Sequence, residues 1–500
     1  MKKIKKLSEV LDSQQNKSSN KQIKRLKELF ESNSDVTFKP VHFVKEQQSY
    51  EVQLIYCEGM IDEQALDQRI METLNRFFAK PSVLQLSKEY ILNHLSIPSL
   101  QSIEKTEDLL SNVFNGAVVL LFQGCETLFA VNLGKKPQRQ PEETNMEVAI
   151  VGPRDNFIED ITVNMALIRK RLPSNSLCSE DFIIGRRSQT KVRVLYIKDI
   201  TDQQILQELR TSIHLIDIDV LFSGNQLMSL IEKKSSFFPR YDYSGRPDFA
   251  VQSLVTGRVI ILIDGFPYVI ITPANLFLLF KSAEDSAFPV VFNSMERLGR
   301  IMGLFIAIFV PGFWIAITAF HQNQLPISLL ATVVESRRGV PLSPALEGFL
   351  MLIIFELFRE AGLRLPMAIG QTLSVVGGLI IGDSAIRAGI TSPSMLVVIA
   401  GSIVAGFTIV NQTLTGTVSV LRFFVLLLSS FLGFFGFFVS MFFIITYLSN
   451  IRIFGVPYLS FVTRFDIKSV LVTSFRLPWK AYAKRPSMLN PKDSTRKEGE

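Results

Sequence analysis

The residue types that most often perform catalysis are scattered along this chain instead of being gathered into motifs. The histidines are isolated from one another: His42, His94, His214 and His321. No P-loop, glycine-rich dinucleotide fingerprint, HExxH zinc motif or nucleophile elbow occurs in the sequence. Asp217 and Asp219 form a close carboxylate pair beside an expected strand end, where a turn or a cap is the ordinary role. The sequence therefore predicts a protein that is not an enzyme and that uses no cofactor or metal.

The cysteines give no sign of a disulfide framework. Cys57, Cys125 and Cys178 are widely separated and odd in number, which favours reduced thiols over disulfides or a zinc site. The first thirty residues are polar and are not followed by an apolar stretch, so they do not read as a secretory signal. The soluble part of the protein is therefore expected to stay in the cytoplasm.

Polar residues with regular spacing occur inside two uncharged stretches of the chain. In residues 388–421 small or polar residues recur every three or four positions, which places them on one helix face: Gly401, Ala405, Thr408, Gln412, Thr415 and Ser419. In residues 366–382 three more have helical spacing: Gln371, Ser374 and Gly378. Such faces are unfavourable against lipid, so they face water or another helix. Hydrogen-bonded packing within one subunit and a face between subunits both remain open.

These faces belong to a second half of the chain that is built for lipid. The protein is 47% apolar, and the apolar residues are concentrated in residues 301–447. Residues 301–320 carry no charge, and at about 1.5 Å per residue they can cross a hydrocarbon core of about 30 Å. Pro311 lies within this stretch and permits a kink if neighbouring helices satisfy the freed carbonyl groups.

Full membrane spans are expected to begin near four residues: Ile301, Pro366, Met395 and Phe424. The last two are separated by Arg422. Residues 345–358 are expected to be partly embedded or re-entrant, because Glu347 and Glu356 lie on opposite sides of a helix. Basic residues collect at both ends of the chain, so the positive-inside rule predicts cytoplasmic ends and an even number of spans. The net charge of +7 is modest, but basic ends that flank a hydrophobic region favour an anionic bilayer as partner and not nucleic acid.

The first half contains an internal repeat. Five residues recur 140 positions later: Val52, Tyr56, Asp62, Gln64 and Leu66 correspond to Val192, Tyr196, Asp202, Gln204 and Leu206. Two apolar runs are related by an offset of 141, and each contains a hairpin signal, Gln123-Gly124 in the first and Asp264-Gly265 in the second. The sequence therefore predicts two similar α/β subdomains.

A helix is expected between the two subdomains, because Asn156 and Glu159 have capping-box spacing before an amphipathic stretch. Arg169 and its two basic neighbours are interpreted as its solvated C-terminal end. The expected organisation has six parts: a flexible basic arm at 1–35, a first α/β subdomain at 36–140, a helical connector at 141–180, a second α/β subdomain at 181–290, a transmembrane domain of four or five helices at 291–455 and a basic cytoplasmic tail at 456–500.

Several longer motifs carry a resemblance to a known family. In the first half they are Gly152-Pro153-Arg154, Arg246-Pro247-Asp248 and Asp264-Gly265. In the second half they are Glu347 and a string that contains Glu356, Arg359, Glu360, Arg364 and Pro366. Together they resemble the A subunit of spore germinant receptors, the GerA family. Gly245 and Asn411 depart from the family's usual pattern, and the second departure puts a local helix bend in doubt.

The resemblance implies a subunit of a nutrient-responsive receptor in the inner membrane of the spore. It further implies two partners, a permease-like B subunit that binds germinant and a lipoprotein C subunit, and it implies that A subunits oligomerise into an ion channel. On this interpretation the face that carries Gln371, Ser374 and Gly378 borders a pore between subunits, together with the face from Thr408 to Ser419. The alternative is a non-conducting scaffold or signalling subunit of the same receptor. A secondary transporter is disfavoured, because no inverted repeat of broken helices is evident.

Overall fold

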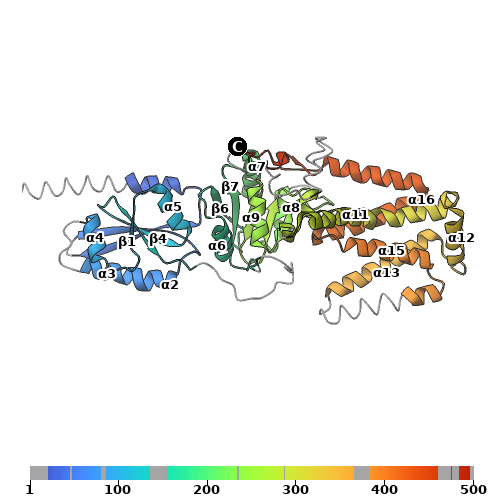
Figure 1. The fold of residues 1–500 in the computed structure, drawn as a ribbon, viewed down its shortest axis with the longest axis horizontal. Coiled ribbons are helices and arrows are strands. Elements are labelled where there is room, and N and C mark those ends of the chain that lie inside the picture. The colour runs from blue at the N-terminus through green and yellow to red at the C-terminus, as the bar shows by residue number, and fades with distance from the viewer. Residues whose placement is uncertain are drawn as a thin grey trace, which may run out of the picture. The chain divides into compact units, whose positions relative to one another are not determined.

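The chain forms two compact units, each with its own hydrophobic core (Figure 1). The computed structural model describes residues 21–45, 48–79, 86–135, 153, 155–232, 236–286, 288–364, 382–459, 475 and 484–495. The first unit comprises Met1–Lys234, Tyr243–Pro273 and Ala483–Glu500, and the second comprises Ser235–Asp242 and Ala274–Tyr482. In Figure 1 the blue and green elements belong to the first unit, and the yellow and orange helices belong to the second.

The first unit begins with an antiparallel sheet whose strand order is β1-β2-β4-β5-β3. Its strands are β1 (Val36–Lys45), β2 (Gln48–Cys57), β3 (Gln101–Ile103), β4 (Ala117–Phe122) and β5 (Leu128–Asn132). The accompanying helices are α2 (Glu63–Ala65), η1 (Leu66–Met71), α3 (Glu72–Ala79), α4 (Lys88–His94) and α5 (Thr106–Phe114). Alternate residues of β2 enter different cores, Leu54 that of α3 and α4 and Ile55 that of α5. The sheet therefore lies between two helical layers.

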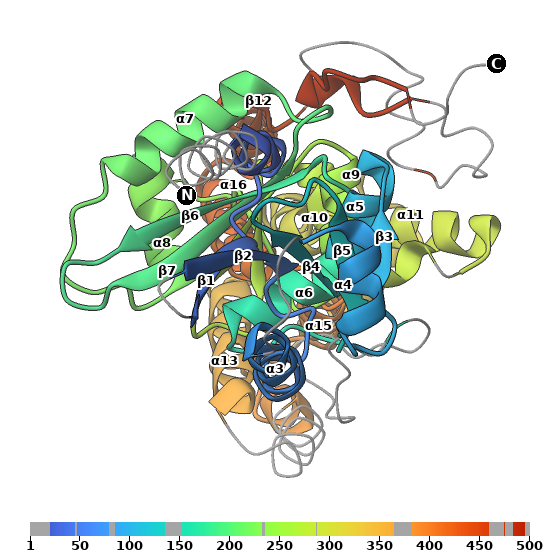
Figure 2. The same cartoon turned by 90° about the vertical axis from the view of Figure 1, so that its left-hand side faces the viewer.

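A second sheet follows with the order β6-β7-β9-β10-β8. Its first two strands, β6 and β7, are labelled in Figure 2. Its strands are β6 (Leu177–Ile184), β7 (Thr190–Ile197), β8 (Asp242–Ser244), β9 (Val259–Ile263) and β10 (Val269–Thr272). Its helices are α6 (Ile161–Arg171), α7 (Gln203–His214), α8 (Gly224–Glu232) and α9 (Pro247–Val255). Counted from its first strand, each sheet has the same spatial order.

The two sheets also share one register, as the sequence repeat predicts. Val52 is paired with Phe122 in the first sheet, and Val192 is paired with Ile263 in the second. The partners in the second pair lie 140 and 141 residues after those in the first, which are the offsets found in the sequence. Both hairpin turns contain a glycine with positive φ, 88° at Gly124 and 85° at Gly265, which other residues adopt only with strain. The duplication therefore extends from residue types to backbone pairing.

Part of the segment expected as a flexible basic arm is structured. Residues 21–29 are helical, and Leu26 and Phe30 are buried against the core of the first sheet. This helix precedes β1 as α6 precedes β6, so it occupies the corresponding place in the repeat. The amphipathic spacing of its apolar residues is what allows it to pack on the sheet.

In its described residues from 274 to 459 the second unit is helical apart from a short hairpin. Its elements are α10 (Leu276–Leu279), η2 (Ala283–Ser286), α11 (Val290–Ile315), η3 (Ala316–Phe320), η4 (Gln322–Gln324), α12 (Ile327–Ser336), α13 (Pro344–Arg364), α15 (Pro393–Gly406), α16 (Gln412–Asn450), β11 (Arg452–Ile453) and β12 (Val456–Pro457). Two helical stretches, Val290–Phe320 and Thr413–Asn450, are long and apolar enough to cross a membrane by length and composition. Residues 345–358, expected to be irregular, lie within the 21-residue helix α13.

The helix boundaries between residues 388 and 451 differ from those expected. The predicted single helix over 388–421 is interrupted after α15, and Asn411 caps the start of α16 by accepting a hydrogen bond from the amide of Leu414 at 3.1 Å. The polar stripe therefore does not follow one helix face: Gly401 and Ala405 lie on α15, whereas Thr415 and Ser419 lie on α16.

α16 consists of two helical segments that meet at Gly433, where φ is 61°. Thr417 and Tyr447 lie thirty residues apart, which in a straight helix is about 45 Å. Both nevertheless contact Phe237: the hydroxyl of Thr417 donates to its carbonyl at 2.6 Å, and the hydroxyl of Tyr447 accepts from its amide at 3.1 Å. The two segments are therefore antiparallel. Arg422 lies inside the first segment and does not separate two spans as expected.

Candidate functional site

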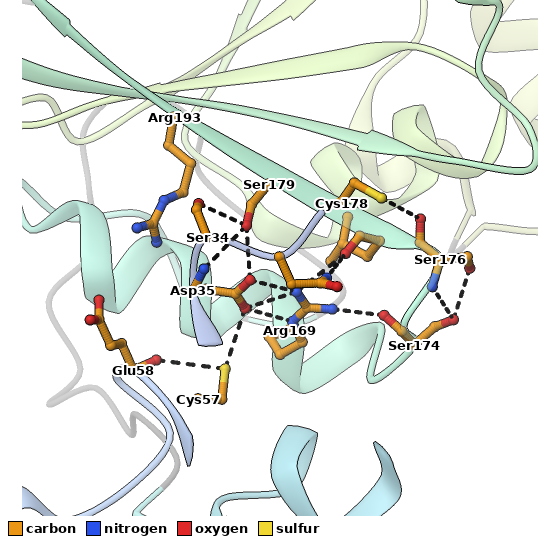
Figure 3. A network of polar contacts seen from close by, with 12 residues as sticks. Ser34, Asp35, Cys57, Glu58, Arg169, Ser174, Ser176, Cys178, Ser179 and Arg193 are labelled. Carbon is orange, nitrogen blue, oxygen red and sulfur yellow. Dashed lines mark hydrogen bonds and ion pairs between the residues drawn. The ribbon is translucent and has the colours of Figure 1, made fainter. Parts of the chain in front are cut away.

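A buried ion pair joins the two halves of the first unit (Figure 3). The guanidinium of Arg169 donates from Nη2 to both carboxylate oxygens of Asp35, at 2.9 and 2.8 Å, and from Nε to Oδ2 at 3.0 Å. Both side chains are fully buried. Asp35 directly precedes β1 of the first sheet, and Arg169 lies in the last turn of α6, which leads into the second sheet.

Three further side chains complete this junction. Ser179 of β6 donates to Asp35 Oδ1 at 2.8 Å, and the thiol of Cys57 lies 3.3 Å from Oδ2, as Figure 3 shows. The guanidinium carbon of Arg169 lies 4.2 Å from the centre of the Phe114 ring. The residue before β1 and residues of β2, β6, α5 and α6 therefore converge on one charged pair.

The electrostatics of the junction indicate a structural role. Burial alone would raise the pKa of Asp35, but attraction to Arg169 and the hydrogen bonds from Ser179, Arg169 and Cys57 outweigh it and lower the pKa. Burial, together with the charge of Asp35, raises the pKa of the Cys57 thiol well above its usual range. Cys57 is therefore held as a thiol, which is the unreactive form. Arg169, expected on a solvated helix end, is instead one of the most buried side chains. The expectation was wrong because the partner of Arg169 lies 134 residues away in the sequence.

In the second unit Glu347 is completely buried near the start of α13. Its Oε1 accepts three hydrogen bonds: from the amide of Ser392 at 2.6 Å, from the hydroxyl of Ser392 at 2.5 Å and from the hydroxyl of Thr391 at 3.1 Å. Ser392 is the N-cap of α15, where the helix dipole favours a negative charge. Nε of Arg337 lies 4.0 Å from the other carboxylate oxygen. Glu347 therefore ties the start of α13 to the start of α15.

A second charged group lies further along the same helices, and we call it the Arg422 cluster: Glu356, Arg359, Ser419 and Arg422. Arg359 pairs with Glu356 at 2.6 Å and donates to the hydroxyl of Ser419 at 2.8 Å. Arg422 is 3% exposed and donates from Nε to the carbonyl of Ala307 at 2.6 Å and from Nη2 to the carbonyl of Ser402 at 3.2 Å. These side chains line one small cavity between α13, α15 and α16.

Arg422 itself lies near the middle of an apolar helical segment. Arg422 is ten residues after the start of α16 and eleven before the bend at Gly433, so it is about 15 Å from either end of that segment. Ionisable side chains at such a depth are costly and are kept where they pair or serve a function. The cluster is therefore the strongest candidate functional site of the second unit.

Comparison with known proteins identifies the family to which these features belong. The family model of the Bacillus/Clostridium GerA spore germination protein matches residues 24–488. This chain belongs to the GerA family. It is 41% identical over 449 residues to spore germination protein XA of Bacillus anthracis, with 89% of this chain and 90% of the relative covered. It is 31% identical to spore germination protein B1 of Bacillus subtilis (strain 168), with 94% and 97% covered.

Two more similar proteins are known, one over nearly the whole chain and one over its first half. An uncharacterized membrane protein of Bacillus subtilis (strain 168), YfkQ, is 29% identical, with 97% of this chain and 93% of the relative covered. The crystal structure of the N-terminal domain of the A subunit of the Bacillus megaterium spore germinant receptor GerK3 is 24% identical, with a TM-score of 0.37. That match covers 50% of this chain and 93% of the crystallised one.

In the first unit, the residues on which the sequence resemblance was based serve as structural connections. Arg246 pairs with Asp248 at 2.8 Å, and Pro247 occupies the first turn of α9. Asp264 accepts a hydrogen bond from the amide of Ile161 at 3.3 Å, and the amide of Gly265 donates to the carbonyl of Glu159 at 2.8 Å. The β9–β10 turn is thus attached to the start of α6. Pro153 is exposed, and its neighbours Gly152 and Arg154 lie outside the described residues.

The predicted pore or inter-subunit residues are only partly described. Gln371, Ser374, Gly378 and the family-signature Pro366 lie outside the described residues, and the side chains of Gln412 and Arg364 are not described either. The hydroxyl of Thr415 donates to the carbonyl of Asn411 at 3.3 Å, and Ser419 accepts from Arg359. Glu360, in the same family string, is exposed on α13.

Thr408 is exposed, but its side chain lies against α11 of the same unit. Its hydroxyl donates to the carbonyl of Ala405 at 2.7 Å, and a methyl group added at Gly303 of α11 would lie 2.1 Å from it. The close approach of α11 to Thr408 therefore needs a glycine at position 303. For this residue the geometry favours helix packing within one subunit.

The residues that the sequence did not single out are those with long-range partners. Asp35 has no motif around it, and its role becomes visible only through Arg169 and Ser179. Arg422 carried one available signal, since it is a lone charge within a long uncharged stretch. A lone charge of this kind is consistent with a functional residue as well as with a helix end, which is where Arg422 was expected.

Proposed function

We propose that this chain is a subunit of a nutrient-responsive spore germination receptor and that copies of it assemble into an ion channel opened by germinant. Membership of the GerA spore germination family supports the receptor. The Arg422 cluster is the observation that supports the channel, because Arg422 is a buried charge in the middle of an apolar helix, and such charges mark ion pathways and their gates. The chain contributes no catalytic step and no cofactor to this role.

Oligomerisation follows from the small number of helices. The helices of one chain are too few to enclose a pore, so copies must come together around it. We assign the faces between copies to Gln371, Ser374 and Gly378 and to Gln412 and Thr415 of α16. Ser419 is buried and bonded to Arg359, so it belongs to the Arg422 cluster within one chain. Small and hydroxyl-bearing faces of this kind associate closely in lipid.

The C-terminal segment supports an even number of membrane crossings. The amide of Lys492 donates to the carbonyl of Ile200 at 2.9 Å, and Nε of Arg485 donates to the carbonyl of Val255 at 3.0 Å. Residues 484–495 therefore pack on the first unit, which precedes the helices in the chain. A chain that crosses a membrane and returns to the same soluble unit crosses it an even number of times. Because both ends are basic as well, we propose that the first unit and the tail lie in the cytoplasm beside the spore inner membrane.

The proposed receptor contains two further proteins, a permease-like B subunit that binds germinant and a lipoprotein C subunit. In this assembly the parts between 36 and 290 form the cytoplasmic platform, and 291–455 form the membrane domain. Germinant bound to the B subunit shifts a closed-to-open equilibrium of the A-subunit helices and releases monovalent cations.

Replacing Gln412 or Ser374 with Leu tests the channel, because either change fills a polar face with apolar bulk. We expect altered release of potassium from spores in nutrient broth at unchanged amounts of the receptor. The matched control is Val420→Leu on α16, an outward-facing position that is 54% exposed, where release is expected to stay normal. Normal release in all three variants would contradict the assignment of these faces.

The alternative is a non-conducting scaffold, and one observation favours it. A buried ion pair connects the two sheets of the first unit. Such a connection is what a rigid platform that recruits partners would need. Electrical recording separates the two functions. The assembled receptor in a planar bilayer passes current with germinant if it is a channel and passes none if it is a scaffold.

A further inference from the structure

The helix α11 contains a proline at a position where a hydrogen bond must be supplied from outside the helix. Pro311 has no amide hydrogen, so it cannot donate to the carbonyl four residues earlier, which is that of Ala307. Ala307 is completely buried in the helical unit. A buried carbonyl without a donor is costly, above all in surroundings that contain no water.

Arg422 of α16 supplies this donor. Its Nε lies 2.6 Å from the carbonyl oxygen of Ala307, and its Nη2 lies 3.2 Å from the carbonyl oxygen of Ser402 near the C-terminal end of α15. The negative end of the α15 dipole favours a cation at this place. A methyl group at Gly406 would lie 3.4 Å from Nη2, which is an ordinary contact distance, so α15 passes directly beside the guanidinium. One residue thus bonds to the backbones of two other helices.

The helices cross closely just beyond this contact. A methyl group at Gly312 would lie 2.7 Å from Cγ1 of Val425 and 2.9 Å from Oγ of Ser429. Arg422, Val425 and Ser429 have helical spacing, so the face of α16 that bonds to Ala307 is the face that packs on the proline segment of α11. Bending of α11 at Pro311 therefore cannot change without changing its contact with Arg422.

We propose that Arg422 is the positioning residue that holds α11 at its proline, by supplying the hydrogen bond that Pro311 cannot make, and that this contact stabilises the closed state of the receptor. The second part rests on the proposed channel function. Glu356 and Arg359 line the same cavity as Arg422, but Arg359 donates to a side-chain hydroxyl and touches no backbone of α11 in the part of the chain that the structure describes. Arg422 is thus distinguished from its charged neighbour by its partner.

A double-mutant cycle tests the contact itself. Arg422→Met removes the donor, and Pro311→Ala restores an amide hydrogen that can bond to Ala307 within α11. In thermal unfolding of the purified full chain in detergent, we expect the Met substitution to lose at least half of its destabilising effect when residue 311 is Ala. Arg422→Lys, which keeps the charge and can reach one carbonyl, is expected to be intermediate.

Arg359→Met is the matched control. It removes the other arginine of the cavity, and its effect is expected to be the same with Pro or Ala at position 311. Equal losses for Arg422→Met in both backgrounds would overturn the hydrogen-bond assignment, as would a background dependence of Arg359→Met that is equally large. Should Arg422→Met not accumulate, the Lys variant in the two backgrounds gives the same comparison.

Potassium release from spores in a dilution series of nutrient broth tests the effect on gating. Loss of a contact that stabilises the closed state lowers the broth concentration for half-maximal release, and we expect a decrease of about tenfold for Arg422→Met, within the usual range of such couplings. Adding Pro311→Ala is expected to return it to within about threefold of the unmodified protein. Coupled unfolding with unchanged release in every variant would refute the gating role, whereas normal release from spores that lack the chain would refute the proposed function.

Discussion

Removing one member of the Asp35–Arg169 pair is expected to open the junction between the two sheets. In Asp35→Asn the guanidinium of Arg169 stays buried without a counter-charge, whereas it now has three hydrogen bonds to that carboxylate. Breaking a buried ion pair in this way costs about 3–5 kcal/mol, because the remaining charge cannot be solvated. Such a loss is a large share of the stability of an ordinary domain, which is about 5–15 kcal/mol.

A surface pair in the same unit provides the control. Arg186 and Asp217 are 2.5 Å apart, but their side chains are 71% and 64% exposed. Exposed pairs contribute about 0–1 kcal/mol, so Asp217→Asn is expected to change stability within that range. The double variant Asp35→Asn with Arg169→Met removes the charge from both sides and is expected to be less damaging than Asp35→Asn alone.

Hydrogen exchange of the full chain in detergent measures the effect where it occurs. Amides of β1 and β6 are expected to lose protection by a factor that corresponds to about 3 kcal/mol or more in Asp35→Asn, and to keep it in Asp217→Asn. Equal and small changes in the two variants would refute the reasoning, because they would mean that the buried pair is solvated or compensated as the surface pair is. If the double variant loses as much amide protection as Asp35→Asn alone, an unpaired buried charge is not the cause of the loss.

Three further predictions concern pH, a buried carboxylate and helix packing. The pKa of Asp35 is lowered in the folded protein from an ordinary value of 3.8, so its contribution to stability is present above about pH 4 and is lost as the pH falls through the lower folded pKa. The difference in unfolding free energy between the unmodified protein and Asp35→Asn is therefore expected to shrink only below about pH 4. Unfolding measured at a series of pH values follows this difference. Glu347→Gln weakens the bonds from Ser392 and is expected to cost about 1–3 kcal/mol in thermal unfolding of the full chain. Gly303→Ala places a methyl group 2.1 Å from Thr408 and is expected to cost about 1–3 kcal/mol in the same assay, whereas Gly401→Ala, with nothing within 4 Å, is the neutral control.

Local and periodic features were predictable from the sequence. The offsets of 140 and 141 anticipated both the shared topology of the sheets and the pairing of Val192 with Ile263, because a repeated pattern of apolar residues sets a repeated register. Asp264-Gly265 predicted a hairpin turn, because few residues other than glycine adopt the required positive φ. The possibility that another helix satisfies the carbonyl freed by Pro311 was likewise open to sequence reasoning, although its donor, Arg422, was not identified.

Long-range partners and helix ends inside uncharged stretches were not predictable in the same way. The burial of Arg169 depends on Asp35, and no spacing rule relates residues 134 positions apart. The helix break at Asn411 depends on a single cap and the bend at Gly433 on a single backbone angle, neither of which interrupts the hydropathy of the stretch. Arg422 was therefore placed at a helix end, although burial and its two carbonyl partners place it in the middle of a helix.

The channel function is tested most directly by recording current across a planar bilayer that contains the receptor assembled from this chain and its partner subunits. A cation current that appears on addition of nutrient broth, and that needs less broth in Arg422→Met, is the result expected of a germinant-gated channel held closed through α11. A correctly assembled receptor that binds nutrient and passes no current would contradict the channel and leave the scaffold as the function of the chain.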